Sequence, residues 1–85
     1  MEPERVLAFE SWEALASVLT VERYRLLRHL LAHPEPSISA LARSLGRHLR
    51  RVQADVRALE AAGLVDRSGG SVRAAADRLQ ATIEL

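Results

Sequence analysis

Residues 37–65 decide the fold of this chain, and they read SISALARSLGRHLRRVQADVRALEAAGLV. Two amphipathic patterns are separated in this stretch by Gly46, whose conformational freedom suits a tight turn. Apolar residues at three- and four-residue intervals mark the inward stripe of each pattern: Leu41 and Leu45 in the first, then Leu49, Val52, Val56 and Leu59 in the second. The spacing therefore predicts a short helix over 38–45 and a longer helix over 48–62.

The face opposite this stripe on the longer helix is rich in arginine. Its outward positions are Arg47, Arg50, Arg51, Ala54, Arg57 and Ala58, with His48 and Gln53 on the flanks. Residues 43–57 hold five arginines and one acid, Asp55, whereas a helix whose charges are merely solvated usually mixes both signs. Guanidinium groups pair bidentately with phosphate and with the O6 and N7 edge of guanine, and a helix fits the major groove. We therefore expect this helix to bind double-stranded DNA, with the small Ala54 allowing a close approach.

The charge of the chain is unevenly distributed although its formal net charge is only +1. Residues 1–36 carry four arginines against six acids, residues 37–73 seven against three, and residues 74–85 one against two. All twelve basic residues are arginine. A localised positive field of this kind steers a protein onto a phosphate backbone, whatever the total charge.

Length and composition exclude several classes of protein. Eighty-five residues suffice for a single domain over 1–85 with one small core, for which partnering with a second copy is unsurprising. The chain has no cysteine, no apolar run of membrane-spanning length and no secretory signal, so we expect a soluble cytoplasmic protein. It has no serine-histidine-acid grouping and no glycine-rich phosphate loop, so we expect no enzyme activity and no cofactor.

The segments before residue 37 predict two more helices. The run 6–9 is either a strand or a lead-in, and Ser11 caps a helix to about Leu19 whose inward face would be Trp12, Leu15, Ala16 and Leu19. Thr20 caps the next helix, which ends before Pro34; its inward face would be Tyr24, Leu27, Leu30 and Leu31. Ser37 then caps the helix over 38–45.

The segments after residue 63 predict β structure. Residues 64–73 indicate a hairpin around Gly69-Gly70, a wing with Arg67 and Arg73 on either side of its tip. These two arginines either contact phosphate or the minor groove, or are simply exposed strand charges. Residues 79–85 alternate strictly between apolar and polar, which predicts a strand. That strand needs a neighbour, and the candidates are the hairpin, the run 6–9 or the same elements of a second subunit.

With these residues in place, the chain resembles winged helix-turn-helix transcriptional regulators of the MarR and ArsR kind, with a mainly α fold and a small β wing. It is most similar to a family of small prokaryotic proteins assigned as DNA-binding, some of them antitoxin-type repressors. The matching pieces are Phe9-Glu10-Ser11, Leu19-Thr20 with Arg23, Ser37-Ile38 through Leu41-Ala42, Leu45-Gly46-Arg47, Val52, Asp55-Val56, Leu59 and Gly63-Leu64. Two departures are His48, where the family tends to have an acid, and Val21, where a proline often stands.

The resemblance implies a helix-turn-helix over 37–62, a wing over 64–73 and a dimeric repressor that places residues 48–62 in the major groove. It also implies that Asp55 orients an arginine or caps a neighbouring element, and it makes a cognate toxin one candidate protein partner. The candidate DNA-binding residues are Ser37, Arg47, His48, Arg50, Arg51, Gln53, Ala54, Arg57, Arg67 and Arg73.

Two alternatives stay open at the level of sequence. His29 and His33 lie one helical turn apart and could share a metal ion, with Glu35 as the only further ligand nearby, although His33 also suits a helix C-terminus as a simple dipole partner. The same fold also serves as a protein-protein interaction module without DNA binding. The salt dependence of duplex binding distinguishes this module from a DNA-binding protein, because only a DNA-binding protein has a duplex affinity that falls steeply with ionic strength.

Overall fold

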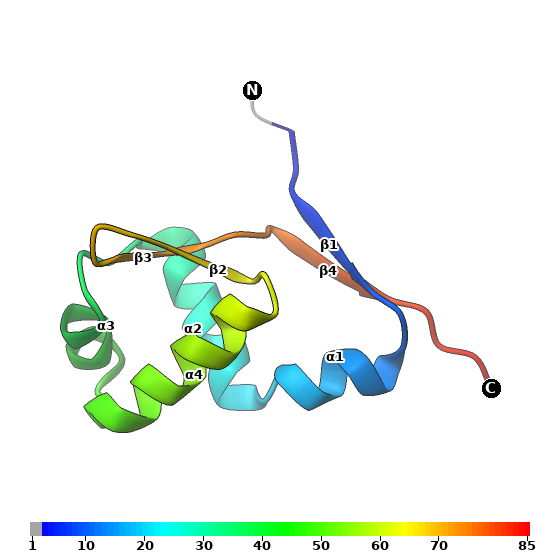
Figure 1. The fold of residues 1–85 in the computed structure, drawn as a ribbon, viewed down its shortest axis with the longest axis horizontal. Coiled ribbons are helices and arrows are strands. Elements are labelled where there is room, and N and C mark those ends of the chain that lie inside the picture. The colour runs from blue at the N-terminus through cyan, green and yellow to red at the C-terminus, as the bar shows by residue number, and fades with distance from the viewer. Residues whose placement is uncertain (1–2) are drawn as a thin grey trace.

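The computed structural model describes residues 3–85 and contains four helices and four strands in this part of the chain (Figure 1). In chain order they are β1 (Val6–Phe9), α1 (Trp12–Val18), α2 (Val21–Ala32), α3 (Ile38–Leu45), α4 (Leu49–Ala61), β2 (Val65–Ser68), β3 (Ser71–Ala74) and β4 (Arg78–Ala81). Figure 1 shows a body formed by α2, α3, α4 and the β2–β3 hairpin, and an arm beside it formed by β1, α1 and β4. The result is a small α+β fold. None of the helices in 3–85 has the length and apolar character needed to cross a membrane.

The helices begin where the sequence predicts. The capping hydroxyls each accept a hydrogen bond from a first-turn N–H: Ser11 from Ala14 at 3.1 Å, Thr20 from Arg23 at 3.2 Å and Ser37 from Ala40 at 3.0 Å. Gly46 ends α3 in the left-handed conformation, with φ of 65°, which a side chain would strain. The predicted bounds of α3 are confirmed, and those of α4 differ by one residue at each end.

The core lies between α2, α3, α4 and the hairpin. Its fully buried side chains are Leu26, Leu30, Leu41, Val52, Val56, Leu59, Leu64, Val65 and Val72. In α2 and α4 three predicted core positions are wrong, because Tyr24, Leu31 and Leu49 are 46%, 41% and 41% exposed. In α2 the buried stripe runs through Leu26, Leu27 and Leu30 instead, and the rotation of about 100° per residue puts Tyr24 and Leu31 on its flank.

The arm is packed loosely compared with the body. No residue of α1 is buried, and Trp12, predicted to face inward, is 53% exposed. Of the predicted inward face, Leu15 and Leu19 are half-buried and Ala16 is exposed. The prediction was too strong because α1 packs mainly on β1, so only one flank of the helix meets apolar neighbours.

The predicted hairpin is confirmed. Strands β2 and β3 pair antiparallel from Val65 opposite Ala74 to Ser68 opposite Ser71, and Gly69 and Gly70 make the turn with φ of 58° and 92°. Glu35 extends this sheet by two backbone hydrogen bonds with Val72, at 3.0 and 2.8 Å. The segment between α2 and α3 is thereby tied to the hairpin.

The predicted C-terminal strand is confirmed only in part, because β4 covers Arg78–Ala81 and not 79–85. Of its three candidate neighbours the one found is β1, which pairs with it in parallel from Val6 opposite Arg78 to Phe9 opposite Ala81. The pairing stops there because the chain leaves β1 and caps α1 at Ser11. Within residues 3–85 no strand therefore pairs with 82–85.

Candidate nucleic-acid interface

The turn between α3 and α4 sets the direction of the arginine-rich helix. Gly46 N–H donates to the carbonyl of Arg43 at 3.2 Å, and Arg47 N–H donates to the carbonyl of Ala42 at 3.0 Å, which closes α3 and starts a new direction. His48 then caps α4, its Nδ1 accepting from the N–H of Arg50 at 3.3 Å. Figure 1 shows α3, the start of α4 and the tip of the hairpin at the end of the body away from the arm.

The face of α4 that points away from the core carries arginines with small alanine side chains between them. Val52, Val56 and Leu59 are completely buried, and the rotation per residue places Arg50, Ala54, Arg57 and Ala61 on the opposite side. We call the exposed set Arg50, Arg51, Ala54 and Arg57 the arginine face. Gln53 is half-buried beside it, and the alanine methyl groups leave the backbone approachable between the guanidinium groups.

The arginines of the chain divide into two groups by their contacts. Among residues 3–85, five guanidinium groups make no hydrogen bond and no salt bridge: those of Arg43, Arg50, Arg51, Arg57 and Arg73. Arg78 forms an ion pair with Glu4, and every other arginine donates to a carboxylate, a carbonyl or the Tyr24 hydroxyl. Four of these five charges come from α3 and α4, so the positive field concentrates around the arginine face. The fifth, Arg73 on β3, lies opposite Asp66 and lines a shallow pocket with Asp77, away from that face.

Arg47 does not belong to this face, and its predicted outward orientation is wrong. Its side chain is 19% exposed, its Nη2 donates to Asp55 at 2.8 Å, and its Nε lies 3.5 Å from a carboxylate oxygen of Glu22. Its Nη1 is buried without a protein partner. The projection failed because Arg47 precedes α4, in a turn that aims its side chain back at the junction of α2 and α4.

Asp55 accepts hydrogen bonds from two largely buried arginines, Arg47 and Arg23. It accepts from Arg47 on one oxygen and from Nε of Arg23, 3.0 Å away, on the other, and its side chain is 14% exposed. Arg23 also donates to the carbonyl of Val18 at 2.8 Å. The expectation that Asp55 orients an arginine is confirmed, and it orients two. Asp55, the one acid in the run 43–57, therefore neutralises buried arginines and leaves the charges of the arginine face uncompensated.

The remaining predicted DNA-binding residues lie at the start of α3, at the start of α4 and on the hairpin. The hydroxyl of Ser37 accepts the capping hydrogen bond of α3 and keeps its own proton as a donor. His48 is exposed at the start of α4. On the hairpin, Arg67 lies along the tip and donates to the carbonyls of Ser71 and Gly70, both at 3.0 Å, whereas Arg73 extends into solvent.

One further basic residue belongs to the site but was missed. Arg43 on α3 is exposed and unpartnered, next to the turn that leads into α4. The signal was present in the sequence, because Arg43 opens the run 43–57 in which five arginines occur with one acid. The helical projection of α4 alone could not include a residue from the preceding helix.

The two histidines proposed as metal ligands have other contacts. His29 Nε2 and a carboxylate oxygen of Glu35 are 2.6 Å apart, and the ring of His33 lies 5.5 Å from that of His29. The hydrogen bond from His29, helped by Ser44, holds the pKa of Glu35 below its ordinary value of 4.5. Within 3–85 no three histidine or acidic side chains are grouped so as to hold a metal ion. The hydrogen bond between His29 and Glu35 instead joins the end of α2 to the segment that pairs with β3.

The fold and this basic surface define a small α+β protein with an exposed arginine-bearing helix. The chain belongs to the HVO_A0114 family, which matches residues 18–81. The matched region includes α2, α3, α4, the hairpin and β4, and therefore the whole of the basic surface. Neither a curated protein nor a solved structure shows a significant match to the chain.

Proposed function

We propose that this protein is a sequence-specific double-stranded DNA-binding transcriptional regulator with a winged helix-turn-helix fold. The observation that carries the proposal is the sorting of charge on α4. Arg50, Arg51 and Arg57 point outward without partners, whereas Asp55 turns inward and is neutralised by two other arginines. A merely solvated helix has no physical reason for that separation, since intrahelical ion pairs would stabilise it.

The order of the elements supports this reading. A capped helix, a glycine turn and a longer helix are followed by a hairpin, and the bridge between Glu35 and Val72 gives that hairpin a third, short strand. In this arrangement α3 and α4 form the helix-turn-helix and β2–β3 form the wing.

The roles of the residues follow from their positions. Arg50 and Arg57, at the centre of the exposed side of α4, are placed to donate bidentately to guanine edges, and Ala54 between them allows the helix to enter the groove. Arg43 and Arg51 flank this side of α4 and are assigned to phosphates, as is the N-terminus of α3 at Ser37. Arg73, opposite Asp66 on the hairpin, is assigned no DNA contact. Arg67 is held against the hairpin tip and extends the basic surface there.

The test begins with the selection of duplexes from a random-sequence library, followed by fluorescence anisotropy with the selected site. Arg50→Ala and Arg57→Ala should each cost about 1–3 kcal/mol of binding free energy and relax specificity at one base pair. Arg43→Ala should weaken all sequences alike and lower the salt slope by about one unit. Arg25→Ala, which removes the same charge from a site on α2 that is 69% exposed, is the matched control and should change little.

Two outcomes contradict the proposal. A protein without duplex affinity at low salt would be an interaction module of another kind. Selected-site affinity that survives both Arg50→Ala and Arg57→Ala would show that α4 does not read the bases.

We further propose that the regulator acts as a dimeric repressor. Two copies related by a two-fold axis would present their α4 helices to half-sites about one helical turn, or a small multiple of it, apart. A footprint on the DNA upstream of its own gene should then be symmetric, and a reporter behind that DNA should be expressed less when the protein is present.

A further inference from the structure

The β1–β4 ribbon is incomplete as a sheet. It has two strands, it is separate from the β2–β3 sheet, and within the described residues each of its strands has one hydrogen-bonded neighbour. A two-stranded ribbon is at best marginally stable alone, and its open edges present unpaired N–H and C=O groups. The outer edge of β4 therefore has the capacity to pair with another strand.

The residues that follow β4 continue its apolar alternation, but their apolar side chains are largely exposed. Leu79 and Ala81 are half-buried on the inward face of the ribbon, together with Leu7 and Phe9. The alternation continues past the end of β1 with Ile83, which is 63% exposed, and Leu85, which is fully exposed. In an extended chain Ile83 and Leu85 would lie on the same face as Leu79 and Ala81, and burying them would lower their exposed apolar area.

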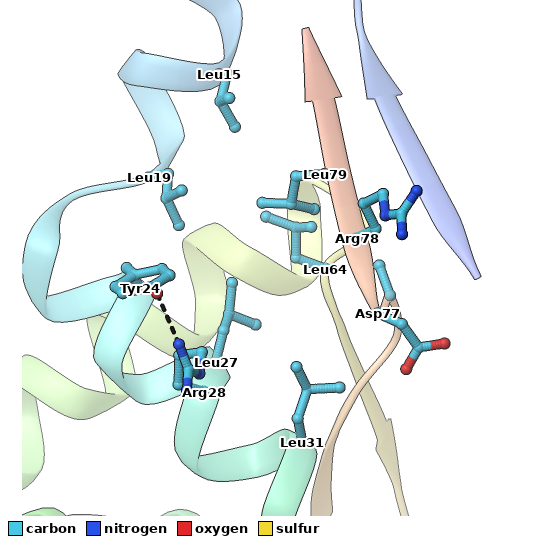
Figure 2. A pocket seen from close by; sticks show the side chains of 11 residues that line it. Leu15, Leu19, Tyr24, Leu27, Arg28, Leu31, Leu64, Asp77, Arg78 and Leu79 are labelled. Carbon is cyan, nitrogen blue, oxygen red and sulfur yellow. Dashed lines mark hydrogen bonds between the residues drawn. The ribbon is translucent and has the colours of Figure 1, made fainter. Parts of the chain in front are cut away.

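An apolar cavity lies beside the same edge. It has a volume of about 340 Å³ and is bounded by α1, α2, the segment between α4 and β2, and the start of β4. Figure 2 shows Leu15, Leu19, Leu64 and Leu79 converging on it. Of the two strands in the ribbon only β4 lines the cavity, through Arg78 and Leu79, so the cavity adjoins β4 and not β1. In Figure 2 the charged groups of Arg78 and Asp77 point away from the leucines, while Arg28 donates to the Tyr24 hydroxyl on the α2 wall; most of the remaining lining is leucine.

We propose that a second copy of the chain covers this edge by pairing β4 with β4 in an antiparallel manner, with Thr82 opposite Thr82 of the second copy. A two-fold axis requires that a strand meeting its own copy be antiparallel to it. Opposite residues share a sheet face, so the apolar faces coincide only in registers that pair odd-numbered residues with odd-numbered ones.

The chemistry of the side chains selects one of these registers. Centring on Thr82 sets Leu79 opposite Leu85 and Ala81 opposite Ile83, while Gln80 faces Glu84, so every apolar residue meets an apolar one. Centring on Ala81 would instead set Leu85 opposite Asp77, and centring on Ile83 would leave Leu79 with no residue of 3–85 opposite it. In the selected register Leu85 of the second copy arrives beside Leu79, the residue through which β4 lines the cavity.

The assembled sheet has four strands in the order β1, β4, β4, β1, with parallel outer pairs and an antiparallel centre. It gives residues 82–85 the hydrogen-bonded neighbour that they lack in the single chain. The interface deepens the proposed function by naming the surface of the dimer, but its argument uses no DNA contact, and its test needs no DNA.

The first experiment uses single cysteines, for which the cysteine-free chain is well suited. In Thr82→Cys the two sulfur-bearing residues face each other with Cα atoms roughly 4.5–5.5 Å apart, within the range of a disulfide. Mild oxidation should therefore give a covalent dimer. Gln80→Cys is the matched control, because in this register the two copies of residue 80 lie about 13 Å apart and cannot bridge. Covalent dimers from Gln80→Cys, or none from Thr82→Cys, would overturn the register.

The second experiment measures the oligomeric state by sedimentation. The unaltered chain should be a dimer, and Ile83→Asp should raise its dissociation constant by about 100-fold or more, because two apolar side chains leave the interface and two charges enter it. Val21→Asp replaces a valine that is 64% exposed at the start of α2 and should leave the dimer intact. An unaltered chain that sediments as a monomer, or an Ile83→Asp variant that stays dimeric, contradicts the proposal.

The two proposals fail separately. If α4 reads DNA but the β4 interface is wrong, Arg50→Ala weakens binding and Ile83→Asp changes neither assembly nor affinity. If the interface is right but α4 does not read DNA, Ile83→Asp gives a monomer and Arg50→Ala has no effect on duplex binding.

Discussion

Replacing Asp55 by alanine tests the internal charge cluster that positions α4. The carboxylate accepts at 3.0 Å from Arg23 on α2 and at 2.8 Å from Arg47 in the α3–α4 turn, and all three side chains are at most 22% exposed. Hydrogen bonds to charged groups contribute about 1.5–3 kcal/mol each, and breaking a buried ion pair from one side costs about 3–5 kcal/mol. Residual hydration of the two guanidinium groups lowers that cost.

We therefore expect Asp55→Ala to lose about 3 kcal/mol of the free energy of unfolding. A chain of this length has roughly 4–13 kcal/mol in total, so the loss is a large fraction. The corresponding fall in Tm is about 12–24 °C. The variant removes a single carboxylate but leaves two cations facing each other, and this repulsion is what distinguishes it from an ordinary surface change.

Urea unfolding followed by circular dichroism measures this loss directly. Glu60→Ala is the matched control, because it removes an exposed acid from the same helix and should change stability by about 0.5 kcal/mol or less. In the Asp55→Ala background, Arg47→Ala should cost less than it does in the unaltered chain, since the ion pair is already gone. A loss of less than about 1 kcal/mol for Asp55→Ala would refute the idea that this cluster holds α2 and α4 together.

Three further perturbations test other parts of the fold. Gly46→Ala should destabilise by about 1–2 kcal/mol in thermal unfolding, because a side chain at φ of 65° is strained although no neighbouring atom obstructs it. Leu59→Ala should cost about 2–5 kcal/mol in urea unfolding, because its side chain is completely buried in the core. Glu35→Gln should flatten the acid limb of a stability-pH curve. The hydrogen bond from His29 lowers the pKa of Glu35, so the stability it contributes is present above about pH 4.5 and is lost as the pH falls through the lower pKa of the folded state. Equal acid sensitivity of the two chains would contradict this.

Local chemistry in the sequence was enough to predict most of the elements. Side chains at Ser11, Thr20 and Ser37 cap the helices that follow them, and Gly46 takes the one backbone conformation that ends α3. These signals act within a few residues, so they can be read without knowledge of the rest of the chain. The same holds for the outward arginines within α4, because helical periodicity alone separates them from Val52, Val56 and Leu59.

Contacts between distant segments could not be predicted in this way. Arg47 lies outside the helical periodicity, and only the approach of α2 to α4 brings it to Asp55 together with Arg23. Tyr24 and Leu31 were expected in the core, but they border the cavity, because α1 and β4 stand away from α2 there.

The alternating tail, residues 79–85, shows which features depend on the sequence and which depend on the tertiary structure. Its sequence determined that one face would be apolar, because side chains on a strand alternate between two sides. The tertiary structure decided that β1 is its neighbour and that the pairing ends at Ala81, where the partner strand turns into α1. The sequence thus determined the caps, the periodicities and the charge of the helix faces, since each depends on neighbours along the chain. Only the tertiary structure decided which arginine is buried, which strand pairs with which and where the apolar surface stays open, because these depend on the packing of segments that are far apart in sequence.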